Sequence, residues 1–206
     1  PPRSTLFPYT TLFRSYPASD FNITLSLDVD APATQVALVV AWKNNRDVSD
    51  SREDGTLLFW GETDGDPGVS IYLDQSADEV CGLTVGNAAL TSALGCENGD
   101  ICVAVYLSGD STGGAASRLL VMDASGVDTD TAAAGGAVSA FDAASIGSLI
   151  NSGAATQHCD LPIYFAAFVE LSDNLDIAGS VGLELAKRIA VAARRMAQSI
   201  DGVINA

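Results

Sequence analysis

The sequence predicts an all-β protein, a single antiparallel β-sandwich followed by one C-terminal amphipathic helix. The first observation is Asp100–Met122, where two apolar runs, ICVAVYL and RLLVM, flank a polar, Gly-rich connector, as in a hairpin at the middle of a sheet. The second is Ile23–Asp30 (ITLSLDVD), which alternates apolar and polar residues as a strand with one buried face does. The third is that the apolar period changes from two to helical spacing only after Leu171.

The composition favours one domain and disfavours both nucleic-acid binding and a membrane span. The chain has 206 residues, 48% of them hydrophobic, which suffices for one sizeable core. Its net charge of -16, with 26 Asp and Glu against 10 Lys and Arg, repels phosphate backbones and so disfavours nucleic-acid binding. No apolar run approaches the roughly 18 residues of a spanning helix, so we expect no membrane span. Most of the acids are Asp, which favours the turns between strands.

Two stretches of the sequence look foreign to the fold. Residues Thr5–Ser15 (TLFPYTTLFRS) read as the translation of a common sequencing-library adapter. We therefore treat Pro1–Ser15 as an artefactual segment, expect it to be irregular and peripheral, and place the domain at Tyr16–Ala206, with the natural N-terminus missing. Gln157–Ile163 (QHCDLPI) matches the reverse adapter's QTCALPI at five of seven positions. If this stretch has the same origin, His158 and Cys159 carry no function.

The remaining strands follow from short apolar runs between polar loops. Val36–Trp42 (VALVVAW) is apolar on both faces, so we expect it deep in the sandwich or under a covering element. In contrast, the Ala-, Gly- and Ser-rich stretch Asp123–Gly153 has little periodic signal. The other expected strands are Thr56–Trp60, Gly68–Asp74, Val80–Val85, Ile101–Leu107, Arg118–Met122 and Ile163–Leu171.

A helix is predicted over Ala178–Ile200, after a cap at Ser172 or Asp173 and before a stop at Asp201-Gly202. Apolar residues recur at spacings of four, four, three, four and four, which places them on one stripe: Val181, Leu185, Ile189, Ala192, Met196 and Ile200. The helix also carries four of the ten basic residues. A basic amphipathic helix suits a membrane surface or an acidic partner, but packing against the acidic β body of its own chain is favoured.

Three cysteines, Cys81, Cys96 and Cys102, lie in one strand-loop-strand region. A disulfide Cys81–Cys96 or Cys96–Cys102 would place the protein outside the cytoplasm, whereas the alternative is buried, reduced thiols. The spacing fits no zinc pattern because there is no CxxC pair.

Clustered acids suggest a calcium site. Asp64 and Asp66, in Asp64-Gly65-Asp66, and the Asp128-Thr129-Asp130 segment resemble fragments of a calcium loop, since hard cations need several oxygens. Neither continues to the terminal Glu of a full loop. Asp64 and Asp66 are our candidate metal ligands, with an acidic turn that binds nothing as the alternative.

No catalytic pattern is present, so we expect no enzyme. The sequence lacks an ExE pair of strand carboxylates and a GxSxG elbow. Among aromatic residues, Trp42 and Trp60 lie in apolar runs and are expected in the core. Tyr72 and Tyr106 lie on the more polar sides of their strands, which makes them the candidate ligand-binding residues at the surface.

The order of these segments resembles the concanavalin A-like, laminin-G-like jelly-roll family. The resemblance covers roughly Asn22–Arg188 and is carried by the following stretches: ITLSLDVDAP with QVALVVAW, TLLFWGETDG, ICVAVYLSGDSTGGAASRLLVMDASG, and SIGSL followed by IYFAAFVELSDNLD and a helix. It departs from the family in lacking the aromatic-His start of the central strand and in its longer terminal helix. It implies an antiparallel jelly-roll β-sandwich and no transferable metal or sugar residue.

Two functions follow from this resemblance and composition. The first is an extracellular recognition module for glycans or cell-surface polymers. The second is a structural subunit of a phage virion, phage tail or extracellular assembly, in which copies of the chain associate.

Overall fold

The structure is a computed structural model. It describes residues 23–26, 35–44, 55–61, 68–74, 79–84, 89–92, 94, 96, 99–109, 116–132, 143–151, 154–156, 159, 161–171 and 175–204. The described strands are β1 Ile23–Ser26, β2 Val36–Lys43, β3 Gly55–Gly61, β4 Gly68–Asp74, β5 Glu79–Thr84, β6 Leu90–Ser92, β7 Ile101–Ser108, β8 Ser117–Met122, β9 Val127–Ala132, β10 Ala143–Ile146, β11 Leu149–Asn151, β12 Ala154–Thr156 and β13 Ile163–Glu170. The helix α1 spans Ser180–Ile204.

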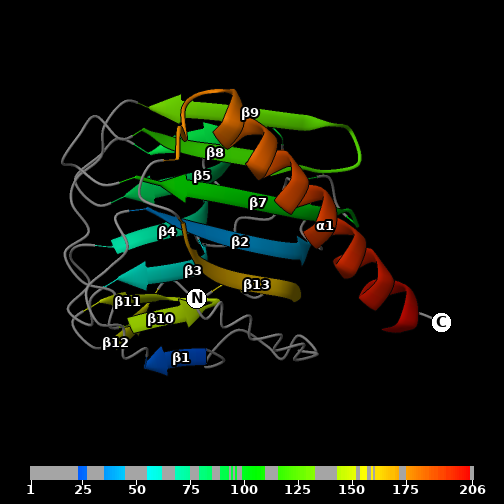
Figure 1. Ribbon diagram of the computed structural model, residues 1–206. Coiled ribbons are helices and arrows are strands. Elements are labelled where there is room, and N and C mark those ends of the chain that lie inside the picture. The colour runs from blue at the N-terminus through cyan, green and yellow to red at the C-terminus, as the bar shows by residue number, and fades with distance from the viewer. Residues whose placement is uncertain are drawn as a thin grey trace, which may run out of the picture.

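The strands form two main antiparallel sheets (Figure 1). A six-stranded sheet has the order β1-β10-β3-β4-β5-β6, and a five-stranded sheet has the order β13-β2-β7-β8-β9. Strands β11 and β12 pair separately as a two-stranded sheet. Strand β7 is the central strand of its sheet, as the sequence of the Asp100–Met122 hairpin predicted.

The core between the two sheets is built from alternate residues of their strands. From the five-stranded sheet it takes Leu38 and Trp42 on β2 and Tyr106 on β7, and from the six-stranded sheet it takes Trp60 and Ile71. Because side chains alternate along a strand, the intervening residues of β2 and β7 point to the outside of the sandwich. Those residues are also apolar, so they require a second cover.

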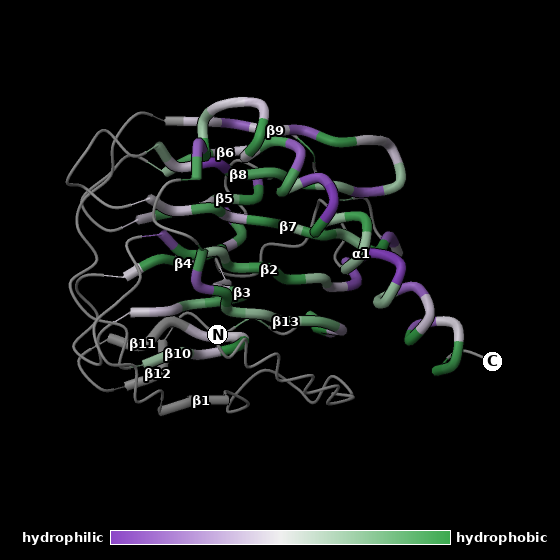
Figure 2. Tube along the Cα trace, viewed as in Figure 1, coloured by the Kyte–Doolittle hydropathy of each residue, from purple (hydrophilic) through white to green (hydrophobic). Residues whose placement is uncertain are grey.

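Helix α1 supplies this cover by lying across the outer face of the five-stranded sheet (Figure 1). The second apolar layer joins Ala37, Val39 and Ala41 of β2 and Val103 and Val105 of β7 to the helix. Figure 2 shows β2 and β7 mainly in green, the colour of hydrophobic residues, and the residues of these strands are buried on both faces. The prediction that Val36–Trp42 lies under a covering element is confirmed, as is packing of the helix against its own β body.

The helix presents a different face to the sheet from the one predicted. Its buried residues are Gly182, Ala186, Ala190, Ala193 and Ala197, each one position after a member of the predicted stripe. Val181 and Met196, which the stripe placed inward, are 57% and 43% exposed. Small residues allow the helix backbone to approach the sheet closely, and this gain in packing outweighs the burial of larger side chains. Gly182 packs instead on the segment before the helix, since a Cβ there would clash with the backbone of Asp176 and Ile177.

The ends of the helix also differ from the prediction. The chain before the helix turns at Asp176, whose side-chain Oδ1 accepts a hydrogen bond of 2.9 Å from the backbone N–H of Gly179. The predicted caps, Ser172 and Asp173, lie outside the described residues. Asp201-Gly202 does not stop the helix, which continues to Ile204, because the Asp201 carboxylate is bound by side chains of the sheet rather than by a turn.

Several strands were not predicted. Strand β6 lies outside the expected strands, and β9, β10 and β11 fall in the stretch with little periodic signal. Strand β9, with the sequence VDTDTA, is held by pairing with β8 on one side. Two of its side chains reach across to β6 in the other sheet: Asp128 Oδ2 accepts from Ser92 Oγ at 3.1 Å and Asp130 Oδ2 accepts from the backbone N–H of Thr91 at 3.2 Å. These contacts join the two sheets at one edge of the sandwich.

Candidate functional site

The candidate site is the outer face of the six-stranded sheet around Tyr72, in the middle of strand β4. Val69 and Ile71 on this strand belong to the core between the sheets, so Ser70 and Tyr72 point to the opposite, outer face. The register places Tyr72 between Thr56 of β3 and Cys81 of β5. We call Thr56, Phe59, Ser70, Tyr72 and Cys81 the Tyr72 face.

Most of the Tyr72 face is shielded, but Tyr72 itself is not. Phe59, Ser70 and Cys81 are 1%, 7% and 2% exposed, whereas Tyr72 is half-buried. Strand pairing on both sides holds the Tyr72 backbone in place. A partly accessible aromatic ring fixed in this way offers an apolar stacking surface.

Tyr106, the second predicted ligand-binding residue, is not at the surface. It is 1% exposed and lies in the core between the sheets. Its ring packs on Gly82 of β5, where a Cβ would lie 2.4 Å from Tyr106 Cδ2. The Tyr106 and Thr84 hydroxyls share a hydrogen bond of 2.7 Å, and Thr84 and Ser108 share another of 2.8 Å. Burial raises the pKa of Tyr106 above its usual value.

The prediction that Tyr106 is exposed is therefore wrong. The position of the helix explains the error. The sequence shows that one side of β7 is more polar than the other, and the more polar side of a half-exposed strand normally faces water. Here α1 covers the more apolar side, so the side with Tyr106 faces the inter-sheet core. Its phenol hydroxyl is tolerated there because Thr84 binds it.

The predicted metal ligands Asp64 and Asp66 lie outside the described residues. Asp128 and Asp130, the other acidic pair, lie on a strand and bind β6 instead of forming a loop. Within the described part of the chain, no cluster of three or more His, Cys, Asp or Glu is suited to a metal ion. The only His, His158, also falls outside the described residues.

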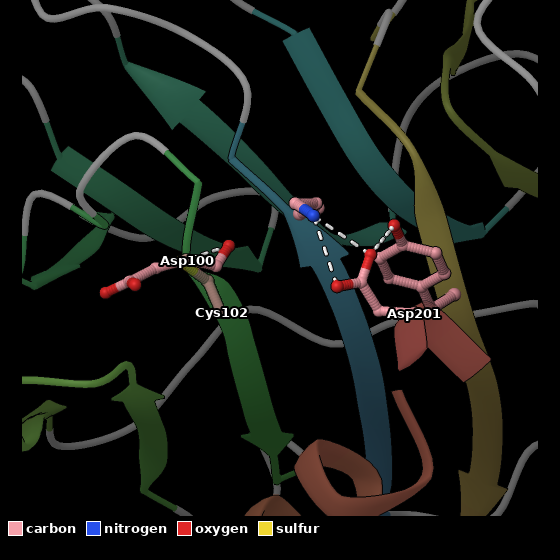
Figure 3. Close-up of polar contacts among 5 residues, drawn as sticks. Asp100, Cys102 and Asp201 are labelled. Atoms are coloured by element: carbon pink, nitrogen blue, oxygen red, sulfur yellow. Dashed lines mark hydrogen bonds and ion pairs between the residues drawn. The ribbon is translucent and has the colours of Figure 1, made fainter. Parts of the chain in front are cut away.

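Three polar side chains, described below, fasten the C-terminal end of the helix to the sheet (Figure 3). Lys43 Nζ, at the end of β2, contacts both carboxylate oxygens of Asp201 at 3.0 and 3.1 Å. The hydroxyl of Tyr164 on β13 donates to Asp201 Oδ1 at 2.7 Å. Asp201 thus binds both Lys43 and Tyr164, so this group is a structural clamp on α1.

The Tyr164 phenol makes the stabilisation by this clamp decrease at alkaline pH. Burial raises its pKa, and the hydrogen bond to Asp201 and the negative charge of that carboxylate raise it further. In the unfolded chain the phenol ionises near its ordinary pKa of about 10. The contribution of Tyr164 to stability is thus full below about pH 10 and is lost as pH rises above it, because only the unfolded state then releases the proton.

We expect wild-type protein to lose more of its free energy of unfolding between about pH 8 and pH 11 than Tyr164→Phe does. Urea denaturation at both pH values measures this difference. Asp201→Asn, which removes the carboxylate but keeps the phenol, should lie between the two. If the free energy of unfolding changes with pH in the same way for wild type and Tyr164→Phe, the phenol has the same pKa in the folded and unfolded states.

Comparison with known proteins supports the fold but reveals no family. No protein-family model matches the sequence, and no curated protein matches it significantly. Among solved structures, the native heptameric SAP-like pentraxin from Limulus polyphemus aligns with a TM-score of 0.56 and 13% identity over 88% of this chain and 80% of the pentraxin chain. The fold is an antiparallel jelly-roll β-sandwich. The predicted fold class is confirmed.

A second neighbour shares the same architecture as part of a larger chain. The botulinum neurotoxin serotype D binding domain aligns with a TM-score of 0.52 and 10% identity, over 76% of this chain and 38% of that one. This jelly roll therefore corresponds to less than half of that protein. None of the described helices is both long and apolar enough to cross a membrane.

Proposed function

We propose that this protein is a non-catalytic recognition module of the concanavalin A-like type that binds a glycan or cell-surface polymer outside the cell. The observation that carries the proposal is the half-buried Tyr72 ring, held on the central part of the six-stranded sheet. Sugars present apolar C–H faces, and an aromatic ring held in place is a stacking partner for such a face.

The burial of the other predicted aromatic residues supports Tyr72 as the stacking residue. Trp42, Trp60 and Tyr106 are 0%, 3% and 1% exposed, so none of them offers a face to a ligand. Tyr72 is the member of that predicted set that remains accessible. Strands β3 and β5 on either side limit its backbone motion, which reduces the entropy lost on binding.

We expect Tyr72→Ala to weaken saturable glycan binding by at least about tenfold, because it deletes the stacking ring. Tyr72→Phe, which keeps the ring, should retain most of the affinity. A glycan array identifies the ligand, and titration calorimetry with the wild type and both variants then measures the loss. Thr91→Ala, an exposed position at the edge of the same sheet, is the matched control and should bind like wild type.

Two outcomes would contradict this proposal in different ways. If folded Tyr72→Ala binds as tightly as wild type, the ligand does not bind at the Tyr72 face. If no glycan on the array shows saturable binding, glycans are excluded as the ligand class. Asp64 and Asp66 stay candidate calcium ligands, and repeating the array with a chelator tests whether binding requires a divalent cation.

The alternative is a structural subunit of a phage virion, phage tail or extracellular assembly. One observation favours it: the helix leaves apolar side chains in solvent, including Val181, Met196 and Val203 at 57%, 43% and 78% exposure. Exposed apolar residues gathered on one element suit contacts between subunits. Sedimentation velocity separates the two proposals, since an assembly subunit should form a defined particle and a recognition module need not.

A further inference from the structure

Two cysteine side chains meet inside the core at the start of the central strand. Cys102 on β7 is 0% exposed and Cys96, in the preceding loop, is 3% exposed. Both belong to the same core cluster between the sheets. Cys102 also contacts the carbonyl oxygen of Asp100, at 3.9 Å (Figure 3). The four cysteines are reduced in this structure.

The backbone around Cys96 is arranged so that its side chain points inward. Cys96 has a φ of 46°, a left-handed conformation that is costly for a residue with a side chain. The side-chain amide of Asn44, just beyond β2, donates to the Cys96 carbonyl oxygen. The backbone N–H of Asn44 donates to the carbonyl oxygen of Asp100 at 2.9 Å. Asn44 thus ties the loop on both sides of the turn and holds Cys96 against Cys102.

The same geometry selects one of the two pairings that the sequence left open. Cys81 pairs in register with Tyr72 and lies on the outer face of the six-stranded sheet. Cys96 lies in the inter-sheet core, so the sheet itself separates these two side chains. Cys102, by contrast, lies in the same core cluster as Cys96, and Asn44 binds the backbone at both Cys96 and Asp100.

We propose that Cys96 and Cys102 form a disulfide in an oxidising compartment and so link the loop before β7 to that strand. The oxidant is a small-molecule disulfide such as oxidised glutathione. One cysteine thiolate attacks it and releases one glutathione thiolate, leaving a mixed disulfide on the protein. The second cysteine thiolate then attacks the protein sulfur, forms the Cys96–Cys102 bond and releases the second glutathione. Each step exchanges one S–S bond for another, and the two cysteines lose their two protons.

Exchange takes place while the chain is folding. Contact with Cys96 and burial both raise the pKa of Cys102, so that in the folded protein its thiol stays protonated and is a poor nucleophile. In the partly folded chain the Cys102 thiol is accessible and ionises more readily. Once formed and enclosed by the sheets, the bond is shielded from reductants in the same way.

The test uses the full chain with Cys81→Ser and Cys159→Ser, which leaves only Cys96 and Cys102. The denatured, reduced protein is refolded with oxidised and reduced glutathione, and free thiols are then counted in denaturant. We expect both thiols to be lost, with a mass decrease of about 2 Da. Cleavage after Glu97, which lies between the two cysteines, should give fragments that separate only after reduction.

Wild-type protein provides a second readout that needs no substitution. Refolded in the same way, it should retain two of its four thiols, and Cys102→Ser should retain all of its remaining three. A disulfide across so short a loop should raise the folding equilibrium constant roughly 10- to 100-fold, which urea denaturation with and without reductant measures. Folded wild type that keeps four thiols, or a bond from Cys96 to Cys81, would overturn the proposal. Neither outcome bears on glycan binding at the Tyr72 face.

Discussion

Replacing Arg118 by methionine should lower the free energy of unfolding by about 3–5 kcal/mol, because it removes a buried charge that several backbone carbonyls share. Arg118 lies on the outer face of β8 and is 5% exposed. Its Nε donates to the carbonyl oxygen of Ile177 at 2.9 Å, and one terminal nitrogen donates to that of Ala178. The other terminal nitrogen donates to Thr129 Oγ1 at 3.0 Å.

These contacts make Arg118 the link between the sheet and the start of the helix. Burial lowers the pKa of the guanidinium, while the nearby charge of Asp176 acts in the opposite direction. Without the guanidinium, the carbonyls at the entry to α1 lose their partners in a place where water reaches them poorly. Methionine fills a similar volume, so the loss reports the hydrogen bonds rather than a cavity.

Chemical denaturation of Arg118→Met and of Arg195→Met measures the effect. Arg195 is an exposed arginine of the same helix, so its replacement should change stability by no more than about 0.5 kcal/mol. Hydrogen exchange should additionally show faster exchange at the N-terminal turns of α1 in Arg118→Met. Equal stabilities for the two variants would show that Arg118 does not hold the helix.

The second large effect concerns the face of the helix that contacts the sheet. Ala190→Leu should cost about 1–3 kcal/mol, because three added carbon atoms must fit where the helix meets the sheet. Ala190 is 0% exposed and packs in the apolar layer with Val39 and Val103. Ala192→Leu adds the same atoms two positions later, at an exposed site. It should be within about 0.5 kcal/mol of wild type.

This pair of variants shows which of two faces of the helix packs against the sheet. The apolar stripe in the sequence contains Ala192 and not Ala190, and the structure buries Ala190 and not Ala192. Thermal melts of both proteins under the same conditions give the comparison. A larger loss for Ala192→Leu would favour the phase that the apolar stripe predicts.

Strands that carry their own hydrophobic signal could be predicted from sequence. Strands β2, β3, β4, β7, β8 and β13 occupy the expected segments to within a few residues. Strands β9 and β10 could not be predicted, since VDTDTA and AASI have weak signals of their own. They become strands because neighbouring strands, β8 for β9 and β3 for β10, offer unpaired backbone groups.

The candidate site was only half predictable. A Tyr beside polar residues on a strand indicates a surface position, and for Tyr72 that position is half-buried and faces outward. For Tyr106 the same pattern failed, because Thr84, which binds its hydroxyl, cannot be paired with it from spacing alone. The contact between Cys96 and Cys102 depends likewise on a turn at Cys96 that no sequence pattern indicates.

The sequence by itself determined that this chain is a β-sandwich with one helix and that β2 must be covered on both faces, because a continuous apolar run cannot leave one face in water. Only the tertiary structure decided which side of β7 faces the other sheet and which side of the helix faces β7. Those choices depend on how closely two surfaces can approach. Alanines at 186, 190, 193 and 197 let the helix lie close to Val103 and Val105, and this contact leaves Val181 and Met196 in solvent.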